Sequence, residues 1–520
     1  MNIATLLQSQ ASTRPDACAI IDRYRGRDRR NTFADLESDA ARGAALLHEH
    51  GIGKGDRVLV FQPMSYELYV ALLAIFRLGA VAMFVDPSAG RVHIEQCCDI
   101  AEPHALIASA RAHLLRLVSV ALRRIPTKFV VGRYAPGAIS MRRARFLPLC
   151  EPIAACEPED PALLTFTSGS TGRPKAALRS QGFLIAQHWA LSRALRLQAG
   201  EVDLTTLPVF LLANLAAGLT SVIPNADLRF PGRIKAAAVI EQVERLGITR
   251  SAGSPAFYQR LVEYCAAEGK ALAGISRLDT GGAPVLPSLL DRMHRTAPTA
   301  KVVAVYGSTE AEPMAHVAWS EMGEDDLVRM QSGHGLLAGL PVPEVTVRVL
   351  QDHFGVQIGP YMLGEFQAQS LPAGEVGEIV VTGEHVLKGY LHGVGDKETK
   401  FEVGGERWHR TGDAGYFDAS GRLWLVGRCS ARIKDAKGIL YPFTVECAAQ
   451  FIAGLLRSAM VGHEGRRILL VEAGESFCST SLLTTLAWVE LDEVRVVKQI
   501  PVDKRHNAKV DYTRVHELLS

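Results

Sequence analysis

Residues 164–175 read LTFTSGSTGRPK, the pattern of an apolar strand that leads into a loop of hydroxyl and glycine residues and ends in a lysine. Gly169 and Gly172 can adopt positive φ, so consecutive backbone N–H groups can turn towards one anion. The side chain of Lys175 adds a positive charge suited to phosphate oxygens. The stretch therefore predicts a binding loop for a nucleotide triphosphate, and its hydroxyl donors are Thr167, Ser168, Ser170 and Thr171.

This loop differs from the phosphate loop of ATPases and GTPases, in which Gly-Lys is followed at once by Ser or Thr at the start of a helix. Here Arg173 and Pro174 separate the second glycine from Lys175, and Pro174 delays the start of any helix. Taken alone, the loop could also be a serine- and glycine-rich surface turn. Other segments of the chain must therefore decide between a phosphate-binding loop and a surface turn.

Length and charge narrow the classes of protein that fit. A chain of 520 residues is too long for one core, so we expect two or more domains. Apolar residues make up 48% and charged residues 22%, as in ordinary globular proteins. The net charge of +2 does not indicate a nucleic-acid partner. Short basic runs at residues 23–30 and 142–145 lack a nucleic-acid-binding motif and are interpreted as solvated loops.

The cysteines and the apolar windows indicate a cytoplasmic location. The nine cysteines are odd in number, scattered and without a CxxC spacing, which favours reduced thiols over disulfides or a zinc site. The first ten residues show no secretory signal. The most apolar window, Tyr69 to Val85, contains Arg77 and Gly79, so we expect no transmembrane segment.

Hydrophobic periodicity predicts an α/β fold. In the helix expected over residues 32–48, five apolar residues fall on one stripe, and a strand (56–61), a helix (67–78) and another strand (80–85) follow. The same alternation returns between residues 236 and 305, which is typical of a largely parallel sheet. The stripe consists of Phe33, Leu36, Ala40, Ala44 and Leu47.

From about Gly339 the pattern changes to short strands separated by turns, at residues 345–350, 377–382, 416–417 and 423–426. These strands predict a β-rich subdomain that completes a large N-terminal domain of mixed parallel sheets and helices, residues 1–427. Gly427–Arg428 is the expected boundary with a small, mobile α+β lid domain, residues 428–520.

Two segments that follow predicted strands carry residue types suited to a nucleotide. Residues 281–284 (GGAP) allow close backbone approach to a flat ring. Residues 306–310 (YGSTE) offer an aromatic ring for a base, a hydroxyl for phosphate and a carboxylate for Mg²⁺. Mg²⁺ is commonly held by one or two carboxylates plus substrate phosphates, so Glu310 alone suffices. Taken singly, each segment is more simply a turn or a solvated loop end.

Three later segments complete the set. Residues 408–413 (WHRTGD) end in a carboxylate suited to ribose hydroxyls, and Arg428 of the Gly-Arg pair adds a guanidinium. Lys509 lies in the sequence NAKVD near the C-terminus. Asp413 alone is usually a turn residue and Lys509 alone a surface charge. The occurrence of all these motifs in this order along one chain is what favours a nucleotide site over unrelated turns and surface charges.

Together and in this order, the motifs resemble those of the adenylate-forming superfamily: acyl-CoA synthetases, adenylation domains of peptide synthetases, and luciferases. The resemblance extends from residues 32–36 to Lys509, nearly the whole chain. It implies an enzyme in which a carboxylate attacks the α-phosphate of Mg·ATP, acyl-AMP forms and pyrophosphate leaves. Such a reaction depends mainly on positioning and charge stabilisation.

The resemblance also implies roles for individual residues. Lys509, carried by the small domain, would neutralise charge on the reacting oxygens, Thr309 would contact the α-phosphate, and Glu310 would bind Mg²⁺. Asp413 and Arg428 would bind the ribose hydroxyls. The remaining nucleotide contacts would be Thr167, Ser168, Gly169, Ser170, Thr171, Gly172 and Lys175 at the phosphates, and Gly281, Gly282, Ala283, Pro284 and Tyr306 at adenine, with Gly307 and Ser308 beside them.

The chain departs from the common pattern at several positions. Leu211 replaces a histidine that many members carry after Pro-Leu-Phe, and Ala431 stands where many have an aspartate hinge. The C-terminal domain is shorter than usual, and residues 505–508 (RHNA) replace the common Pro-Ser-Gly before the lysine. These departures resemble the β-lactone synthetases of bacterial long-chain olefin biosynthesis, as do residues 219–224, 253–256, 438–441 and 501–509.

The resemblance implies that the enzyme activates a long-chain β-hydroxy fatty acid and cyclises it to a β-lactone. The alternatives are a fatty acyl-CoA ligase or an acyl-AMP ligase that loads an acyl carrier protein, and a degenerate binding protein is a third. CoA is possible but doubtful as a cosubstrate, because an internal hydroxyl needs no CoA tunnel. The expected partner is a small acyl substrate, and an acyl carrier protein and pathway enzymes are further candidates. The apolar acyl site is expected near Phe210, Leu211, Ser254 and Phe257.

Overall fold

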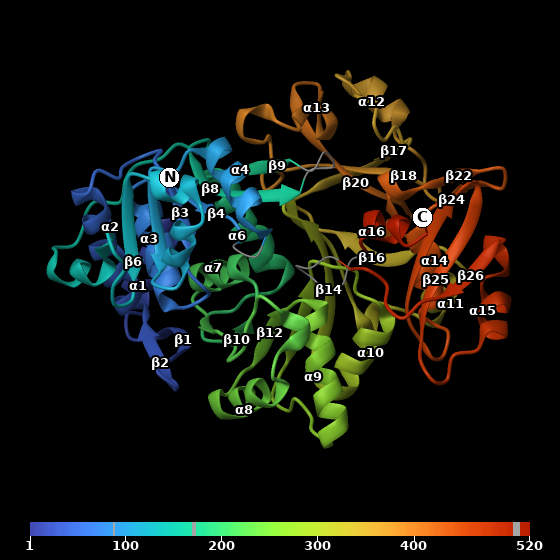
Figure 1. Ribbon diagram of the computed structural model, residues 1–520, viewed down its shortest axis with the longest axis horizontal. Coiled ribbons are helices and arrows are strands. Elements are labelled where there is room, and N and C mark those ends of the chain that lie inside the picture. Colours follow the sequence, from blue (N-terminus) through green and yellow to red (C-terminus); the bar gives the residue numbers. More distant parts are fainter. Residues whose placement is uncertain (87–88, 169–172, 503–509, 520) are drawn as a thin grey trace. The chain divides into compact units, whose positions relative to one another are not determined.

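The computed structural model describes residues 1–86, 89–168, 173–502 and 510–519 (Figure 1). Packing divides the chain into two compact units, Met1–Asn225 with Glu384–Lys397, and Ala226–Gly383 with Glu398–Ser520. This division rests on packing alone, so the expected functional boundary at Gly427–Arg428 stays a prediction. In the described parts of the chain, the structure has no helix long and apolar enough to cross a bilayer.

A mainly parallel sheet organises the first unit. Its strand order is β7–β6–β5–β3–β4–β8–β9, and every neighbouring pair is parallel except β8–β9. Parallel neighbours need crossover connections. Helices supply them between β3 and β6, whereas residues 132–138 join β6 to β7 without a helix. The strands are β3 (Arg57–Phe61), β4 (Val81–Phe84), β5 (Ala105–Ser109), β6 (Thr127–Val131), β7 (Ile139–Ser140), β8 (Pro161–Ser168) and β9 (Pro174–Ser180).

Helices cover both faces of this sheet. Alternate residues of β3 point to opposite faces: Val58 and Val60 pack with α2 (Phe33–Glu49) and α3 (Tyr66–Arg77), whereas Leu59 and Phe61 pack with α4 (Arg91–Ala101) and α5 (Val120–Arg124). The predicted apolar stripe of α2 is fully buried, which confirms the expected helix. A capping box starts α2, because Asp35 N donates to Thr32 Oγ1 (3.1 Å) and Thr32 N donates to Asp35 Oδ2 (2.9 Å).

The first unit also contains a second, smaller set of strands, β10–β11–β1–β2. β1 pairs in parallel with β11, and β1 and β2 form an antiparallel hairpin. The elements are α1 (Ala4–Thr13), β1 (Cys18–Tyr24), β2 (Arg27–Thr32), α6 (Gln181–Ala194), β10 (Val202–Thr205), α7 (Pro208–Ala217) and β11 (Thr220–Val222).

The second unit begins with the predicted alternation of strands and helices. β12, β13 and β14 run parallel, and α8, α9 and α10 connect or flank them. The expected strands and helices between residues 236 and 305 are all present, with ends shifted by a few residues. Their bounds are α8 (Ala236–Leu246), β12 (Arg250–Gly253), α9 (Pro255–Glu268), β13 (Arg277–Gly281), α10 (Pro287–Thr296) and β14 (Lys301–Ser308).

An antiparallel extension follows, as the predicted β-rich subdomain requires. It continues the sheet in the order β14–β15–β16–β21–β20–β18–β17, with β19 paired to β20. β15 and β16 were not anticipated from the sequence, and β20 is far longer than the expected strand at 416–417. The strands are β15 (Ala311–Ala318), β16 (Leu336–Pro341), β17 (Thr346–Leu350), β18 (Gly377–Thr382), β19 (Lys400–Val403), β20 (Glu406–Phe417) and β21 (Leu423–Arg428), and helix α11 is Glu324–Gln331.

The C-terminal residues form an α+β layer, coloured orange to red in Figure 1. Its sheet has the order β24–β25–β26, and its core includes Val445, Ala448, Leu469 and Val471. The elements are β22 (Ile433–Asp435), β23 (Gly438–Leu440), α14 (Pro442–Ala449), β24 (Leu455–His463), β25 (Arg466–Ala473), α15 (Ser479–Thr485), β26 (Glu493–Val496) and α16 (Tyr512–Glu517).

Candidate active site

Parallel strands bring two of the predicted nucleotide segments together. β13 ends at Gly281 and β14 at Ser308, and the carboxyl ends of parallel strands lie at the same edge of a sheet. Gly281 pairs with Val305, one residue before Tyr306. A Cβ atom on Gly281 would lie only 2.6 Å from the carbonyl oxygen of Val305, so this close strand contact requires glycine.

Tyr306, Asp413 and Arg428 form a hydrogen-bonded cluster. The antiparallel register of β20 and β21 places Asp413 directly opposite Arg428. The Nε of Arg428 lies 3.0 Å from Asp413 Oδ1, and the hydroxyl of Tyr306 donates to Asp413 Oδ2 over 2.7 Å. Three residues widely separated in sequence, each predicted to contact the nucleoside part of ATP, therefore meet at one carboxylate.

The surroundings of Tyr306 and Arg428 in this cluster keep both side chains protonated. Burial, reinforced by the neighbouring carboxylate of Asp413, raises the pKa of Tyr306 well above its ordinary value. Tyr306 therefore stays a neutral hydrogen-bond donor. The charge of Asp413 raises the pKa of Arg428, and Glu310 adds to this effect. The side chain of Arg428 is 50% exposed, so its guanidinium both holds Asp413 and remains open to solvent.

Thr411 supports Asp413 and was not given a role from the sequence. Its hydroxyl accepts a hydrogen bond from Asp413 N (3.0 Å) and donates to the carbonyl of Ile379 on β18 (2.8 Å). Its carbonyl accepts from Arg428 Nη1 (3.2 Å). Thr411 lies within the motif WHRTGD, but only the strand register shows that it fixes both members of the ion pair.

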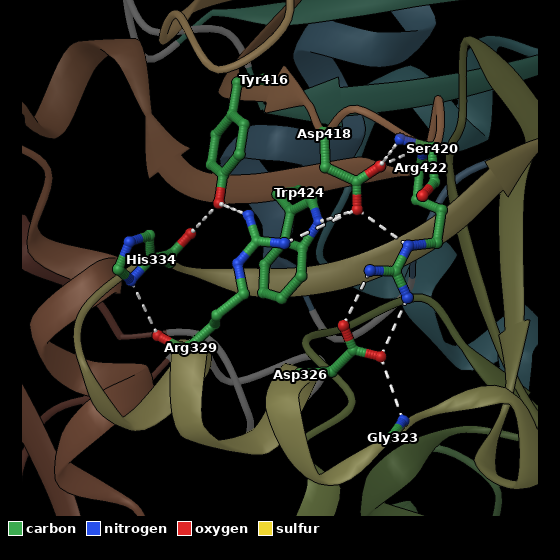
Figure 2. Close-up of polar contacts among 9 residues, drawn as sticks. All are labelled: Gly323, Asp326, Arg329, His334, Tyr416, Asp418, Ser420, Arg422 and Trp424. Carbon is green, nitrogen blue, oxygen red and sulfur yellow. Dashed lines mark hydrogen bonds and ion pairs between the residues drawn. The ribbon is translucent and has the colours of Figure 1, made fainter.

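A polar network fixes the turn that joins β20 to β21, at the opposite end from Asp413 and Arg428 (Figure 2). Asp418 accepts hydrogen bonds from Trp424 Nε1 (3.0 Å), Arg422 Nε (2.8 Å) and Ser420 N (2.9 Å). Arg422 also binds both carboxylate oxygens of Asp326 on α11, at 2.9 and 2.8 Å. Such bidentate pairs are directional, so they restrain the hairpin that carries the site.

The turn between β14 and β15 carries Thr309 and Glu310. Ser308 Oγ accepts hydrogen bonds from the backbone N–H of Glu310 (3.2 Å) and of Ala311 (3.3 Å), so its hydroxyl shapes the turn. Glu310 lies within electrostatic range of Arg428. A glutamate oxygen suits a hard cation such as Mg²⁺. The roles of Thr309, Glu310, Gly307 and Ser308 toward the nucleotide stay predictions, as do those of Gly282, Ala283 and Pro284.

The predicted phosphate loop lies between the two strands of a hairpin. β8 and β9 are antiparallel, with Thr167 opposite Lys175 and Ser168 opposite Pro174. Pro174 is thus followed by a strand and not by a helix. Gly169, Ser170, Thr171 and Gly172 lie outside the described residues, and so does Lys509.

Lys175 has surroundings that the sequence did not indicate. Its Nζ lies 5.7 Å from the centre of the Tyr390 ring, within the range of a cation–π contact. Tyr390 bridges to Ala177 of β9, and its backbone N–H donates to Asp396 Oδ1 (2.8 Å). A Cβ atom on Gly395 would lie 2.6–2.7 Å from the end of the Lys175 side chain. The segment from Tyr390 to Asp396 therefore covers this lysine.

Of the four residues predicted to contact the acyl chain, Phe210, Leu211 and Phe257 are buried and apolar, and Ser254 is polar and half-buried. Phe210 and Leu211 lie on α7 in the first unit, and Leu211 belongs to its main apolar core. In the second unit, Ser254 caps α9 by accepting from Phe257 N (3.4 Å), and Phe257 is fully buried. These positions agree with apolar surroundings, and their contact with substrate stays a prediction.

Comparisons with known proteins identify the family and the fold. Residues 7–391 match the family described as AMP-binding enzyme. Olefin beta-lactone synthetases of Stenotrophomonas maltophilia (strain K279a) and Xanthomonas campestris pv. campestris are 34% and 32% identical, over 98% of this chain and 96% of each relative. The amide bond synthetase McbA from Marinactinospora thermotolerans has the same fold, with a TM-score of 0.81, 22% identity and full coverage of both chains.

The fold and these similarities define an enzyme that activates a carboxylic acid with ATP by adenylation. The chain belongs to the AMP-binding enzyme family. The resemblance drawn from the sequence motifs and the expected α/β fold are thereby confirmed.

Proposed function

We propose that this enzyme adenylates a long-chain β-hydroxy fatty acid and that the acid's own hydroxyl then closes a β-lactone. The observation that carries the proposal is the identity of 34% and 32% to two olefin beta-lactone synthetases over 98% of the chain. The lower similarity of 27% to a protein named 4-coumarate--CoA ligase 2 from rice, over 84% of the chain, supports the broader class only.

The proposed reaction has two bond exchanges. First, a carboxylate oxygen bonds to the α-phosphorus of ATP, and the bond to the pyrophosphate oxygen breaks. Second, the β-hydroxyl oxygen bonds to the acyl carbon, AMP leaves with the electron pair of the acyl–oxygen bond, and the hydroxyl proton passes to a base or to water. The acid loses one water overall. An internal nucleophile has a high effective concentration, so no CoA is needed.

In the proposed site, each charged side chain has a separate role. Asp413 and Arg428 hold the ribose hydroxyls, while Lys175 and the loop after β8 hold the terminal phosphates. Glu310 would hold Mg²⁺, which would neutralise phosphate charge. Lys509 stabilises the oxygens that exchange bonds, and one such contact in a dry site contributes on the order of 3 kcal/mol to transition-state stabilisation.

Apolar surroundings support an aliphatic acid as substrate. Phe210, Leu211 and Phe257 are buried hydrocarbon side chains at the positions expected to contact the acyl group. Leu211 stands where many members of the superfamily carry a histidine. A fatty acyl chain requires such apolar walls and no second cation.

Mass spectrometry of the products tests the proposal. Purified enzyme, Mg·ATP and a long-chain β-hydroxy acid are incubated with and without CoA or a holo acyl carrier protein. We expect AMP and a product lighter than the acid by one water, independent of either acceptor. An acyl thioester that forms only with CoA or carrier protein, or acyl-AMP that accumulates alone, would replace the lactone proposal by the ordinary ligase reaction.

A further inference from the structure

One segment of the first unit is strongly basic. Residues 103–150 contain nine arginine and lysine side chains and neither Asp nor Glu, in a chain whose net formal charge is only +2. The rest of the chain is therefore net negative. The segment runs from β5 through α5 and β6 to the edge strand β7 of the parallel sheet. Positive charge is thus concentrated along one edge of this sheet.

Exposed aliphatic side chains occur within the same segment. Leu114 is 61% exposed, Leu117 75%, Val118 56% and Val120 43%. Leu114 and Leu117 lie on the short helix Ala112–Leu117, Val118 follows it directly, and Val120 begins α5. All four lie between the exposed Arg111 and Arg124. We call these six residues the 111–124 surface.

The local packing holds this surface in one arrangement. Leu122 and Ile125 are buried against Ile94 and Cys97 of α4, so the opposite side of the segment faces outward. The guanidinium of Arg123 donates to the carbonyls of Arg116 (3.1 Å) and Leu117 (3.0 Å), which ties the two short helices together. The exposed leucines and valines therefore lie on a segment whose conformation is fixed by packing and hydrogen bonds.

The nearby acidic group is already engaged. Glu95 of α4 accepts a hydrogen bond from the backbone N–H of Val120 (3.1 Å) and lies 3.8 Å from Arg91. Val92, on the same helix, is also exposed, at 63%. The Glu95 carboxylate beside Val120 is therefore already partnered, and Val92 adds exposed apolar area on the adjoining helix.

We propose that the 111–124 surface binds this enzyme peripherally to an anionic phospholipid membrane. Aliphatic side chains interleaved with arginines enter the boundary between headgroups and acyl chains, while the arginines pair with lipid phosphates. An acidic protein or a nucleic acid would satisfy the arginines alone, whereas four outward-facing leucines and valines match the hydrocarbon of a lipid layer.

Vesicle co-sedimentation of the full-length enzyme tests this proposal. Vesicles of phosphatidylglycerol with phosphatidylcholine are compared with vesicles of phosphatidylcholine alone. We expect binding to the anionic vesicles that weakens as salt is raised, because exposed charges are screened. Failure of the enzyme to prefer anionic vesicles overturns the proposal.

Two double variants separate the contributions of the surface. Leu117→Ser with Val118→Ser, and Arg111→Glu with Arg124→Glu, should each lower vesicle partitioning by roughly tenfold or more. The matched controls are Val328→Ser with Leu340→Ser, at 58% and 55% exposure in the second unit, and Arg25→Glu with Arg27→Glu on the β1–β2 hairpin. Unchanged ATP–pyrophosphate exchange verifies that each variant is folded.

The controls also decide between partners. Equal losses in the controls and in the surface variants would mean that binding follows net charge or general apolarity, and the proposal would fail. Binding to poly-glutamate or to DNA that needs Arg111 and Arg124 but not Leu117 and Val118 would assign the surface to a polyanion instead of a membrane. Neither result bears on lactone formation, so this proposal stands apart from the proposed reaction.

Discussion

The carboxyl group of Glu446 lies where α14, β24 and α16 meet. It accepts hydrogen bonds from the hydroxyl of Tyr512 (2.6 Å) and from the backbone N–H of Met460 (3.0 Å). Burial is the main cause that raises the pKa of Glu446 from 4.5 to about 7, although both hydrogen bonds oppose the shift. This raised pKa makes the stability of the C-terminal layer depend on pH.

Replacing this carboxyl by an amide should remove that dependence. Between the unfolded-state value near 4.5 and the folded-state value near 7, the folded state binds the proton more tightly. The free energy of unfolding therefore decreases as pH rises through this window, by about 3 kcal/mol at most. In Glu446→Gln, which keeps the acceptor oxygen, we expect the midpoint of denaturant unfolding to change less between about pH 5 and about pH 8.

The exposed Glu517 of α16 offers the control, because Glu517→Gln changes the same functional group at the surface. That variant should keep the pH dependence of the wild-type enzyme. If Glu446→Gln keeps it as well, the dependence comes from other carboxyl groups and the assignment to Glu446 is wrong.

At the residue scale, the sequence singled out the side chains that form the Tyr306–Asp413–Arg428 cluster, but it did not show how they meet. Tyr306, Asp413 and Arg428 were each proposed from a separate motif, and the structure joins them within hydrogen-bond distance. The pairing of Asp413 with Arg428 depends on the register of β20 and β21, which includes a bulge between Ala414 and Gly415. Register depends on long-range pairing, so it could not be predicted from one motif.

At the scale of elements, the contact of Gly395 with β9 makes a prediction about Lys175. Gly395 has φ +98°, and a Cβ atom there would lie 2.6–2.7 Å from Cδ, Cε and Nζ of Lys175. In Gly395→Ala, either the backbone moves or the lysine is displaced from its place beside Tyr390. Because Lys175 is proposed to bind phosphate, we expect ATP–pyrophosphate exchange to fall by about tenfold, the loss expected from one weakened charged hydrogen bond.

Gly405 provides a matched control for this substitution. It has φ +85°, in the turn between β19 and β20, and a Cβ atom there would meet nothing within 4 Å. Both alanine variants bear the same backbone strain, about 1–2 kcal/mol, but only Gly395→Ala disturbs the lysine. Equal exchange rates in the two variants would show that the contact with Lys175 is unimportant for adenylation.

Elements predicted from regular apolar patterns are present in the structure, whereas β15 and most of β20 were not predicted. The helix over 236–246 is present with the expected bounds as α8. β15 (AEPMAHVA) is rich in alanine and contains Pro313, and β20 (ERWHRTGDAGYF) contains two glycines and charged residues. Such compositions have low strand propensity. These strands form because their neighbours in the antiparallel sheet supply hydrogen-bond partners, which no local pattern records.

At the scale of the whole molecule, buried charges join the C-terminal layer to the antiparallel sheet of the second unit. Asp352 forms an ion pair with Arg432 and accepts from the hydroxyl of Tyr441 (2.9 Å). Arg410 binds Glu378 nearby, at 2.9 and 2.5 Å. Arg432 and Tyr441 follow shortly after Arg428, where the sequence predicts a boundary, whereas Asp352, Glu378 and Arg410 precede it. The predicted boundary is thus bridged by the Asp352–Arg432 ion pair and the Tyr441–Asp352 hydrogen bond, whose partners come from both sides of it.

Replacing Lys509 tests whether ATP binding and adenylation depend on different sides of that boundary. Tyr306 and Asp413 precede residue 428, so Lys509→Ala should leave ATP binding intact, seen as a wild-type rise in melting temperature with Mg·ATP. Adenylation should fall by about a hundredfold, because the proposed charge on the reacting oxygens loses its partner. The exposed Lys498 gives the control, since Lys498→Ala removes the same charge elsewhere in the C-terminal layer and should change neither property. Loss of ATP binding in Lys509→Ala would make the lysine a nucleotide-binding group, and undiminished adenylation would remove it from the reaction.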